Sequence, residues 1–181
     1  MENKIFSIHC GLFGRPDEVI SIELTPEMFN YTIDELGDDE IFNLVYKMSI
    51  STHFQDDPEH KINIHLKSPK RTLTEIKAEE YFGIKLIGRN LNFTISAEGN
   101  LDTAATLLLM CAPDGKRVAK EGTRYSLKGG FSNHPESLKE YYASHMVTCL
   151  LGRRVDRKYV WDIPSFGNDE ALSMGIINKV I

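Results

Sequence analysis

The sequence has few cysteines, and their spacing fits neither a metal site nor a disulfide scaffold. The 181 residues include only Cys10, Cys111 and Cys149, which are widely spaced and have apolar neighbours. Zinc sites typically use paired Cys-x-x-Cys spacing, and small secreted domains have a much higher cysteine density. We therefore expect buried, reduced thiols. No histidine and carboxylate have metal-ligand spacing, so the sequence predicts no metal and no cofactor.

Long apolar runs and excess positive charge are also missing. No apolar run approaches the ~20 residues needed to span a bilayer, and residues 1–14 lack the long apolar stretch and cleavage site of a signal peptide. The net charge is -5, which offers no general attraction for nucleic acid or anionic lipid. We expect a cytoplasmic protein that binds neither nucleic acid nor membranes.

The remaining composition is that of a globular domain. Apolar residues make up 41% of the chain and charged residues 26%. A chain of this length can bury one substantial core and is too short to require two. We expect a single domain over residues 1–181. Within it, residues 1–27 form a separate N-terminal segment that could act as a strand, an axial loop or a partner-docking arm.

Strand and helix patterns alternate along the chain. After a capping aspartate, apolar residues recur at helical spacing over residues 41–48. Ser68-Pro69 is expected to end a strand at Leu66. Strands are predicted at 19–24, 28–33, 62–66, 91–96, 124–128 and 176–180. Further helices are predicted at 72–86, 102–112, 168–175 and from Ser132 or Asn133 to Gly152. This alternation is typical of an α/β fold with a largely parallel sheet packed against helices.

The predicted helix 102–112 has almost no polar face. Gly99 permits a tight turn before it, and Asp102 or Asn100 can cap it. A helix that is apolar all round belongs in the core. We therefore expect Leu107, Leu108 and Met110 to be fully buried.

Four segments occur in an order and at spacings that resemble a known family. They read IDELGDDEI (33–41), DPEHKINIHLKSP (57–69), DGKRVAKEGTRYSLK (114–128) and NDEALSMGIINKVI (168–181). In this respect the chain resembles ClpP, the proteolytic subunit of the Clp protease, within the crotonase-like group of folds. The resemblance covers roughly residues 28–181. It implies a ββα spiral with a largely parallel sheet and packed helices.

The resemblance places the family's catalytic positions on residues of other types. The serine, which lies four residues after a glycine at the start of a helix, falls on Thr103, counted from Gly99. The histidine base falls on Lys128. The acid falls near Asp162, although a shifted gap would put Tyr159 or Trp161 there.

The family's oxyanion turn is also altered. Its Ser-Pro-Gly-Gly sequence corresponds to Ser68-Pro69-Lys70-Arg71 here, so side chains stand where free backbone approach is needed. The resemblance therefore assigns the oxyanion and substrate-binding positions to Lys70, Arg71 and Ala104, the last through its backbone N–H.

These replacements favour an inactive peptidase. Lysine, with an ordinary pKa of ~10.4, is protonated and cannot act as a base unless burial or nearby cations lower that pKa. We interpret the chain as a non-catalytic, regulatory or assembly subunit of ClpP type. The alternative is a divergent hydrolase that uses Thr103 with Lys128. A thioester-processing crotonase is a weaker hypothesis.

The resemblance also bears on assembly. In ClpP an extended strand and a long helix after the base join two rings. Here the segment between Lys128 and Gly152 is shorter and keeps only a helix. We expect a homo-oligomer or a mixed ring with a ClpP-type subunit, from a dimer up to a single heptameric ring. An ATPase chaperone is a possible further partner.

Other polar residues have plainer interpretations. Ser126 and Lys128 share one face of a strand, which is usually an ordinary face. His134 precedes a proline in an expected surface turn, and His65 is expected to be a hydrogen-bonded core histidine. Lys116 and Arg117 are expected to serve the turn or a subunit contact.

Overall fold

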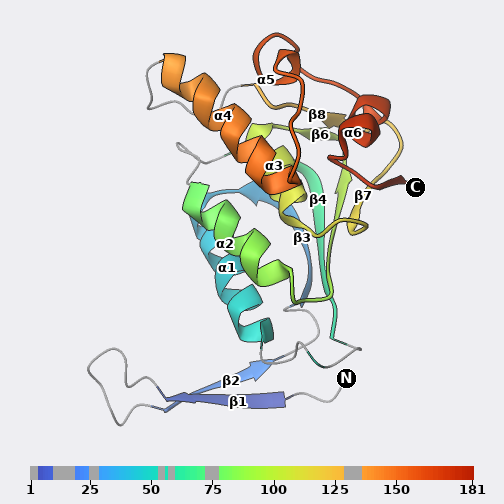
Figure 1. Ribbon diagram of the computed structural model, residues 1–181. Coiled ribbons are helices and arrows are strands. Elements are labelled where there is room, and N and C mark those ends of the chain that lie inside the picture. The colour runs from blue at the N-terminus through green and yellow to red at the C-terminus, as the bar shows by residue number, and fades with distance from the viewer. Residues whose placement is uncertain are drawn as a thin grey trace.

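The computed structural model describes residues 4–9, 19–24, 29–52, 56, 60–71, 78–128 and 136–181 (Figure 1). Five parallel strands form the main sheet in the order β3-β4-β5-β7-β9. Their bounds are Asn30–Leu36 for β3, Ile62–Arg71 for β4, Phe93–Glu98 for β5, Arg117–Ala119 for β7 and Lys179–Val180 for β9. The predicted α/β fold with a largely parallel sheet is confirmed. No described helix is long and apolar enough to cross a membrane.

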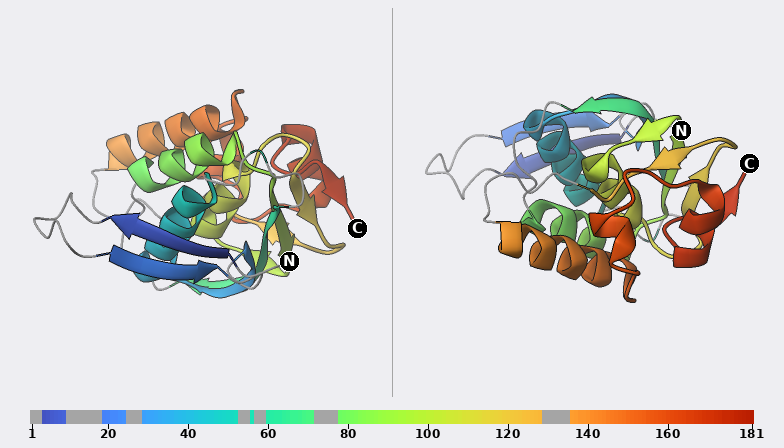
Figure 2. Two further views of the ribbon diagram at one scale, coloured as in Figure 1. Left: turned by 90° about the horizontal axis from the view of Figure 1, so that it is seen from below. Right: turned by 90° about the horizontal axis from the view of Figure 1, so that it is seen from above.

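Helices connect the strands and cover one side of this sheet (Figures 1 and 2). Helix α1 follows β3 and α2 follows β4, whereas α3 follows β5 after the short strand β6 (Asn100–Leu101). The helices are α1 (Asp38–Ser51), α2 (Ala78–Gly88), α3 (Thr103–Cys111), α4 (Glu136–Leu151), α5 (Lys158–Trp161) and α6 (Asn168–Met174). Helix α3 packs against both α2 and α4, so it lies at the centre of the helical layer.

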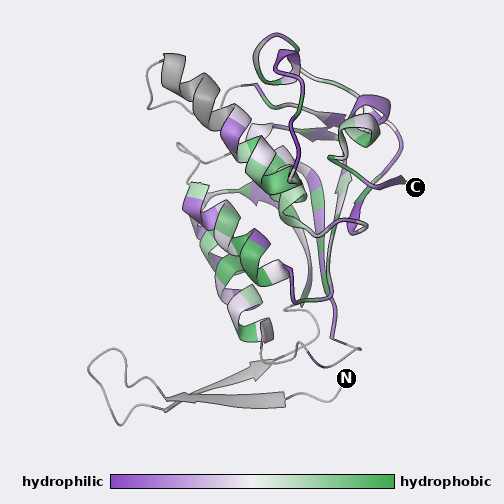
Figure 3. Cartoon of the chain, viewed as in Figure 1, coloured by the Kyte–Doolittle hydropathy of each residue, from purple (hydrophilic) through white to green (hydrophobic). Residues whose placement is uncertain are grey.

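The core is built around α3. All nine residues of this helix are buried, including Leu107, Leu108 and Met110, as predicted. Hydrophobic residues are also prominent in α2 and in the described half of α4 (Figure 3). A helix surrounded on all sides by apolar neighbours needs no polar face, because burial of its side chains stabilises it from every direction.

The two faces of β5 have different environments. Phe93, Ile95 and Ala97 are buried, whereas Thr94, Ser96 and Glu98 between them are half-buried. Since successive side chains of a strand point to opposite faces, the first set faces the helices and the second set faces away from them. The second face of the sheet therefore carries polar side chains that solvent can reach.

The prediction that Ser68-Pro69 ends a strand at Leu66 is wrong. β4 continues to Arg71, and its pairing with β3 shifts at a bulge, with Leu66 opposite Ile33 and Lys70 opposite Glu35. The extra residues of β4 accommodate Pro69, which has no N–H to donate to a ladder. Ser68 adopts a left-handed conformation there, with φ 41°.

Other element boundaries differ from the sequence patterns. β8 covers only Arg124–Tyr125 of the predicted strand 124–128, and it pairs with β6 (Asn100–Leu101) in a separate two-stranded parallel sheet. The predicted strand 19–24 matches β2 (Val19–Leu24), which pairs with β1 (Lys4–His9) in an antiparallel sheet. The helix start expected at Ser132 or Asn133 lies outside the described residues.

The cysteines are only partly as expected. Cys111 is buried and Cys149 is exposed, both as free thiols. Cys149 is exposed because it lies on the outer side of α4, where it contacts His145 at 3.6 Å. Cys10 lies outside the described residues.

Candidate functional site

The turn before α3 is shaped by a close contact between Gly99 and Ser68. Gly99 has φ +78°, and a Cβ atom at this position would lie 1.8 Å from the Ser68 hydroxyl oxygen. That oxygen accepts a hydrogen bond from the Asn100 backbone N–H at 2.9 Å. The Asp102 carboxylate then caps α3 by accepting from the Ala105 N–H at 2.9 Å. These contacts fix the position at which α3 begins.

Thr103, at the predicted nucleophile position, is the first residue of α3 and is only 2% exposed. Its hydroxyl donates a hydrogen bond to the main-chain carbonyl of Lys128 at 2.8 Å. The fold therefore brings the predicted nucleophile and base positions side by side. The contact made by Thr103, however, is with the backbone of Lys128.

The Lys128 side chain is exposed. Its backbone N–H donates to the Ser126 hydroxyl at 3.2 Å, so both main-chain polar groups of Lys128 are held. Within the described part of the chain, the Lys128 ammonium makes no hydrogen bond or ion pair. Ser126 and Lys128 lie beyond the end of β8, so the expected shared strand face is wrong, and the Ser126 hydroxyl contacts the backbone of Lys128 in the segment after the strand.

Asp162, the predicted acid, makes no hydrogen bond or ion pair with Thr103 or Lys128 among the described residues. It is exposed and ends α5, where its backbone N–H donates to Lys158 O at 2.8 Å. Its carboxylate has no hydrogen bond or ion pair among the described residues. Of the two alternatives, Tyr159 packs edge-to-face on Phe166 with ring centroids 5.1 Å apart, and the side chain of Trp161 is outside the described part.

The predicted oxyanion positions lie on a strand and a buried helix. Lys70 and Arg71 pair with Glu35 and Leu36 of β3, and the Lys70 side chain is exposed. Arg71 is the last residue of β4, and its side chain is outside the described part. Ala104 is fully buried in the first turn of α3. A segment held in a sheet has less freedom to turn its N–H groups toward a substrate than a glycine loop.

Comparison with known proteins identifies the fold. No protein-family model matches the sequence, and no curated protein matches it. Solved structures do match. ClpP1 from Listeria monocytogenes matches with 15% identity and a TM-score of 0.58, and the match covers 83% of this chain and 90% of that one. The ClpP protease catalytic domain from Plasmodium falciparum matches with 17% identity, a TM-score of 0.59 and 86% coverage of both chains. The chain has a ClpP-like fold.

A second Plasmodium falciparum structure, described as a peptidase, also matches this chain. Its TM-score is 0.58 at 12% identity, and the match covers 86% of this chain and 96% of that one. At such identities the ClpP-like fold is established, and the chemistry has to be argued from the residues themselves.

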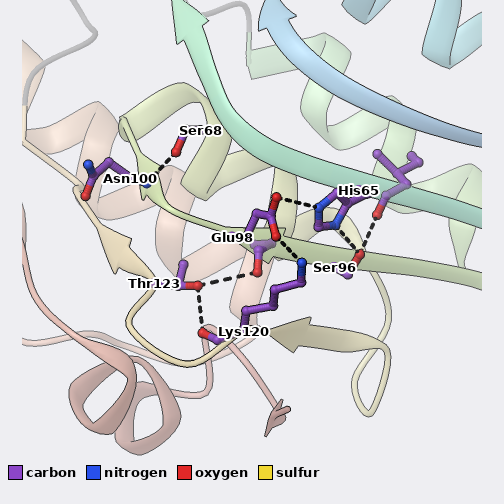
Figure 4. A network of polar contacts seen from close by, with 9 residues as sticks. His65, Ser68, Ser96, Glu98, Asn100, Lys120 and Thr123 are labelled. Atoms are coloured by element: carbon purple, nitrogen blue, oxygen red, sulfur yellow. Dashed lines mark hydrogen bonds and ion pairs between the residues drawn. The ribbon is translucent and has the colours of Figure 1, made fainter.

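Sequence reasoning missed a polar network on the second face of the sheet (Figure 4). His65 of β4 contacts the Ser96 hydroxyl through Nδ1 at 2.9 Å and the Glu98 carboxylate through Nε2 at 3.4 Å. Lys120 forms an ion pair with the other oxygen of Glu98. His65 is hydrogen-bonded as expected, but 27% of its side chain is exposed, so it is not a core histidine.

A hollow adjoins this network. Its volume is about 590 Å³, and it is lined by Asp34, Glu35, Lys67, Ser68, Lys70, Glu98, Gly99, Lys120 and Glu121. It lies at the carboxyl ends of β3, β4 and β5, which is where open parallel sheets most often bind ligands. Lys70, assigned to substrate binding by resemblance, thus lines a hollow that also borders Glu98.

Arg117 serves the turn, as expected. It is 4% exposed, and its guanidinium donates to Ala112 O at 2.9 Å and to the Asp114 carboxylate at 2.7 Å. Lys116 donates to the Asn92 side chain at 3.3 Å. His134 lies outside the described residues. Across the described part of the chain, no three His, Cys, Asp or Glu side chains gather in an arrangement that could hold a metal ion.

Proposed function

We propose that this chain is a ClpP-like subunit without serine-type peptidase activity, which acts by assembling with copies of itself or with a related subunit. The observation that carries the proposal is the hydrogen bond from the Thr103 hydroxyl to Lys128 O. A nucleophilic hydroxyl must give its proton to a base. Here a main-chain carbonyl, which cannot take up that proton, is the acceptor.

The base position supports the same conclusion. The Lys128 side chain is exposed, and the Thr103 hydroxyl contacts the main-chain carbonyl of Lys128 and not its side-chain nitrogen, so the residue at the base position does not face the hydroxyl as a base would. Lys70 also stands in place of a glycine at the oxyanion turn. Loss of one oxyanion donor commonly reduces the rate by ~10²–10³, so changes at the nucleophile, the base and the turn together favour inactivity.

A fluorophosphonate probe and a small peptide ester test this proposal directly. We expect no labelling of Thr103. Any ester hydrolysis at neutral pH should be the same in the wild type and in the Thr103→Ala variant. If labelling occurred at Thr103, or if turnover required Thr103 and rose with pH, the divergent hydrolase with a Thr103/Lys128 pair would replace the non-catalytic subunit.

The proposed partners follow from the ClpP-like fold. A subunit without peptidase activity can still complete a ring and alter its access, its stability or its choice of ATPase chaperone. We propose a homo-oligomer or a mixed ring with a ClpP-type subunit, and a cytoplasmic location. Co-expression with a catalytically active ClpP-type subunit, followed by affinity purification through a tag on this chain, tests the mixed ring. Recovery of this chain alone would favour the homo-oligomer.

A further inference from the structure

The polar network on the second face of the sheet has the connectivity of a nucleophile, a base and an orienting acid. His65 and Ser96 are direct partners in the pairing of β4 with β5, and Glu98 lies two residues beyond Ser96 on the same face. The chain of contacts runs from Ser96 Oγ to His65 Nδ1 at 2.9 Å, and from His65 Nε2 to Glu98 Oε1 at 3.4 Å. All three side chains converge in Figure 4.

The Glu98 carboxylate, which is paired with Lys120, orients the ring of His65. The hydrogen bond of Lys120, followed by that of His65, holds the pKa of Glu98 below its usual value, so this side chain is a carboxylate at neutral pH. A carboxylate can only accept hydrogen bonds, so Nε2, the nitrogen that faces Glu98, is the one that donates. The lone pair of Nδ1 then faces the Ser96 hydroxyl.

We propose that Ser96 is a nucleophilic serine, with His65 as its general base and Glu98 as the residue that positions the imidazole, in a hydrolytic site for small activated esters. This site is separate from Thr103. The Ser96 hydroxyl can also donate its proton to Ile64 O at 3.3 Å, but its contact with His65 Nδ1 is shorter, at 2.9 Å. The required geometry, a hydroxyl within reach of a base that an acid orients, is therefore present before any substrate binds.

The surroundings define the substrate class. The side chains of His65 and Glu98 are 27% and 21% exposed, and Glu98 also lines the adjoining hollow, so a small molecule bound there would lie beside the network. Ser96 pairs with His65 on one side and with Val118 on the other, so the backbone here belongs to the sheet and offers no oxyanion hole. Without such donors, the site can hydrolyse esters that have good leaving groups but not peptides.

The reaction balances without a cofactor. Ser96 Oγ attacks the ester carbonyl and its proton passes to His65 Nδ1, so that the ester C–O bond breaks, the alcohol or phenol leaves with that proton, and an acyl-Ser96 forms. Water then attacks the acyl carbon and gives a proton to Nδ1. That proton returns to Ser96 Oγ as the carboxylic acid is released.

The test uses the purified full chain with p-nitrophenyl acetate and, separately, a fluorophosphonate probe whose adduct is located by peptide mass spectrometry. We expect the adduct on Ser96 and a nitrophenolate release that falls at least about tenfold in Ser96→Ala. The matched control is Thr94→Ala, on the same strand and face, which should hydrolyse the ester like the wild type. Equal rates for Ser96→Ala and the wild type would overturn the proposal.

A second set of variants separates chemistry from folding. His65→Ala should lose the activity, and added imidazole should restore part of it, because a soluble base can fill the vacated position. Glu98→Gln should lower kcat and leave KM unchanged, as expected for a residue that acts through His65. Failure of imidazole to restore any rate, with the fold retained, would overturn the role of His65. An adduct on Thr103 would contradict the proposed absence of peptidase activity at that residue, whereas the absence of an adduct on Ser96 would contradict the present inference.

Discussion

The hydroxyl of Thr103 donates to the main-chain carbonyl of Lys128 at 2.8 Å. This contact joins the start of α3 to the segment after β8. It binds the hydroxyl proton, which a nucleophile would have to release, to a carbonyl oxygen. Two positions that the sequence places 25 residues apart thus meet in space, and the contact between them stabilises the fold.

The hydrogen bond between Thr103 and Lys128 should contribute measurably to stability. We expect Thr103→Val to lower the free energy of unfolding by about 1–2 kcal/mol, because it leaves the Lys128 carbonyl without its donor. Thr103→Ser keeps the hydroxyl and should cost less, and Lys128→Ala should cost almost nothing because only an exposed side chain is removed. Urea denaturation measures all three, and equal losses for valine and serine would contradict this role of the hydroxyl.

The burial of α3 predicts a large effect of truncating its apolar side chains. Leu108 is 0% exposed, and Leu108→Ala should lower the free energy of unfolding by about 2–5 kcal/mol through lost burial and a residual cavity. Leu86 on α2 is 64% exposed and provides the control, since Leu86→Ala should change stability by less than about 0.5 kcal/mol. Similar losses for the two variants in denaturant unfolding would show that α3 is not the packed centre.

The close contact of Gly99 with Ser68 predicts a difference between two glycines of similar conformation. Gly99 and Gly122 both have φ +78°, but an added Cβ meets the Ser68 hydroxyl only at Gly99, and nothing lies within 4 Å at Gly122. Gly122→Ala should cost about 1–2 kcal/mol from backbone strain alone, and Gly99→Ala about 1–3 kcal/mol more from the clash. Adding Ser68→Ala to Gly99→Ala should recover part of the stability lost through the clash. Thermal unfolding measures these losses, and equal losses for Gly99→Ala and Gly122→Ala would refute the clash.

Acid should destabilise the turn between α3 and β7 through Asp114. The side chain of Asn178, and then the charge of Arg117, hold the pKa of Asp114 below its ordinary value. A carboxyl group whose pKa is lower in the folded chain contributes stability above its ordinary pKa, and this contribution is lost as the pH falls through the folded value.

As the pH is lowered from about 6 to about 3, the free energy of unfolding should therefore fall less in Asp114→Asn than in the wild type. Urea denaturation at each pH measures this difference. Glu98→Gln should remove a separate part of that loss, since Glu98 has its own partners, Lys120 and His65, which lower its pKa. The Asp114 prediction fails if the variant and the wild type lose stability equally across this range.

The segment that follows Lys128 is the basis for a prediction of how many subunits assemble. ClpP rings stack through an extended strand and a long helix, and this chain has α4 in the corresponding segment. We expect a dimer up to a single ring. Multi-angle light scattering checks this, and a particle of about fourteen subunits would mean that another surface joins two rings.

The strongest local patterns were enough to predict most of the elements. The run from Thr103 to Cys111 is apolar on every side and is preceded by Asp102, so both its helical state and its burial follow from residues next to one another. The resemblance to ClpP assigned the nucleophile and base positions to Thr103 and Lys128, and that assignment stays a prediction. By contrast, the continuation of β4 through Pro69 depends on a bulge against β3, which local propensity does not encode.

Only the tertiary structure decided what the candidate side chains contact. The sequence indicated that Thr103 and Lys128 hold related positions, but whether the hydroxyl meets the ammonium or the carbonyl depends on how the segment after β8 crosses the start of α3. His65, Ser96 and Glu98 are unremarkable in the sequence because two parallel strands can pair in several registers. The register that sets His65 opposite Ser96 creates their network, and that register is determined by packing of the opposite face of the sheet against the helices.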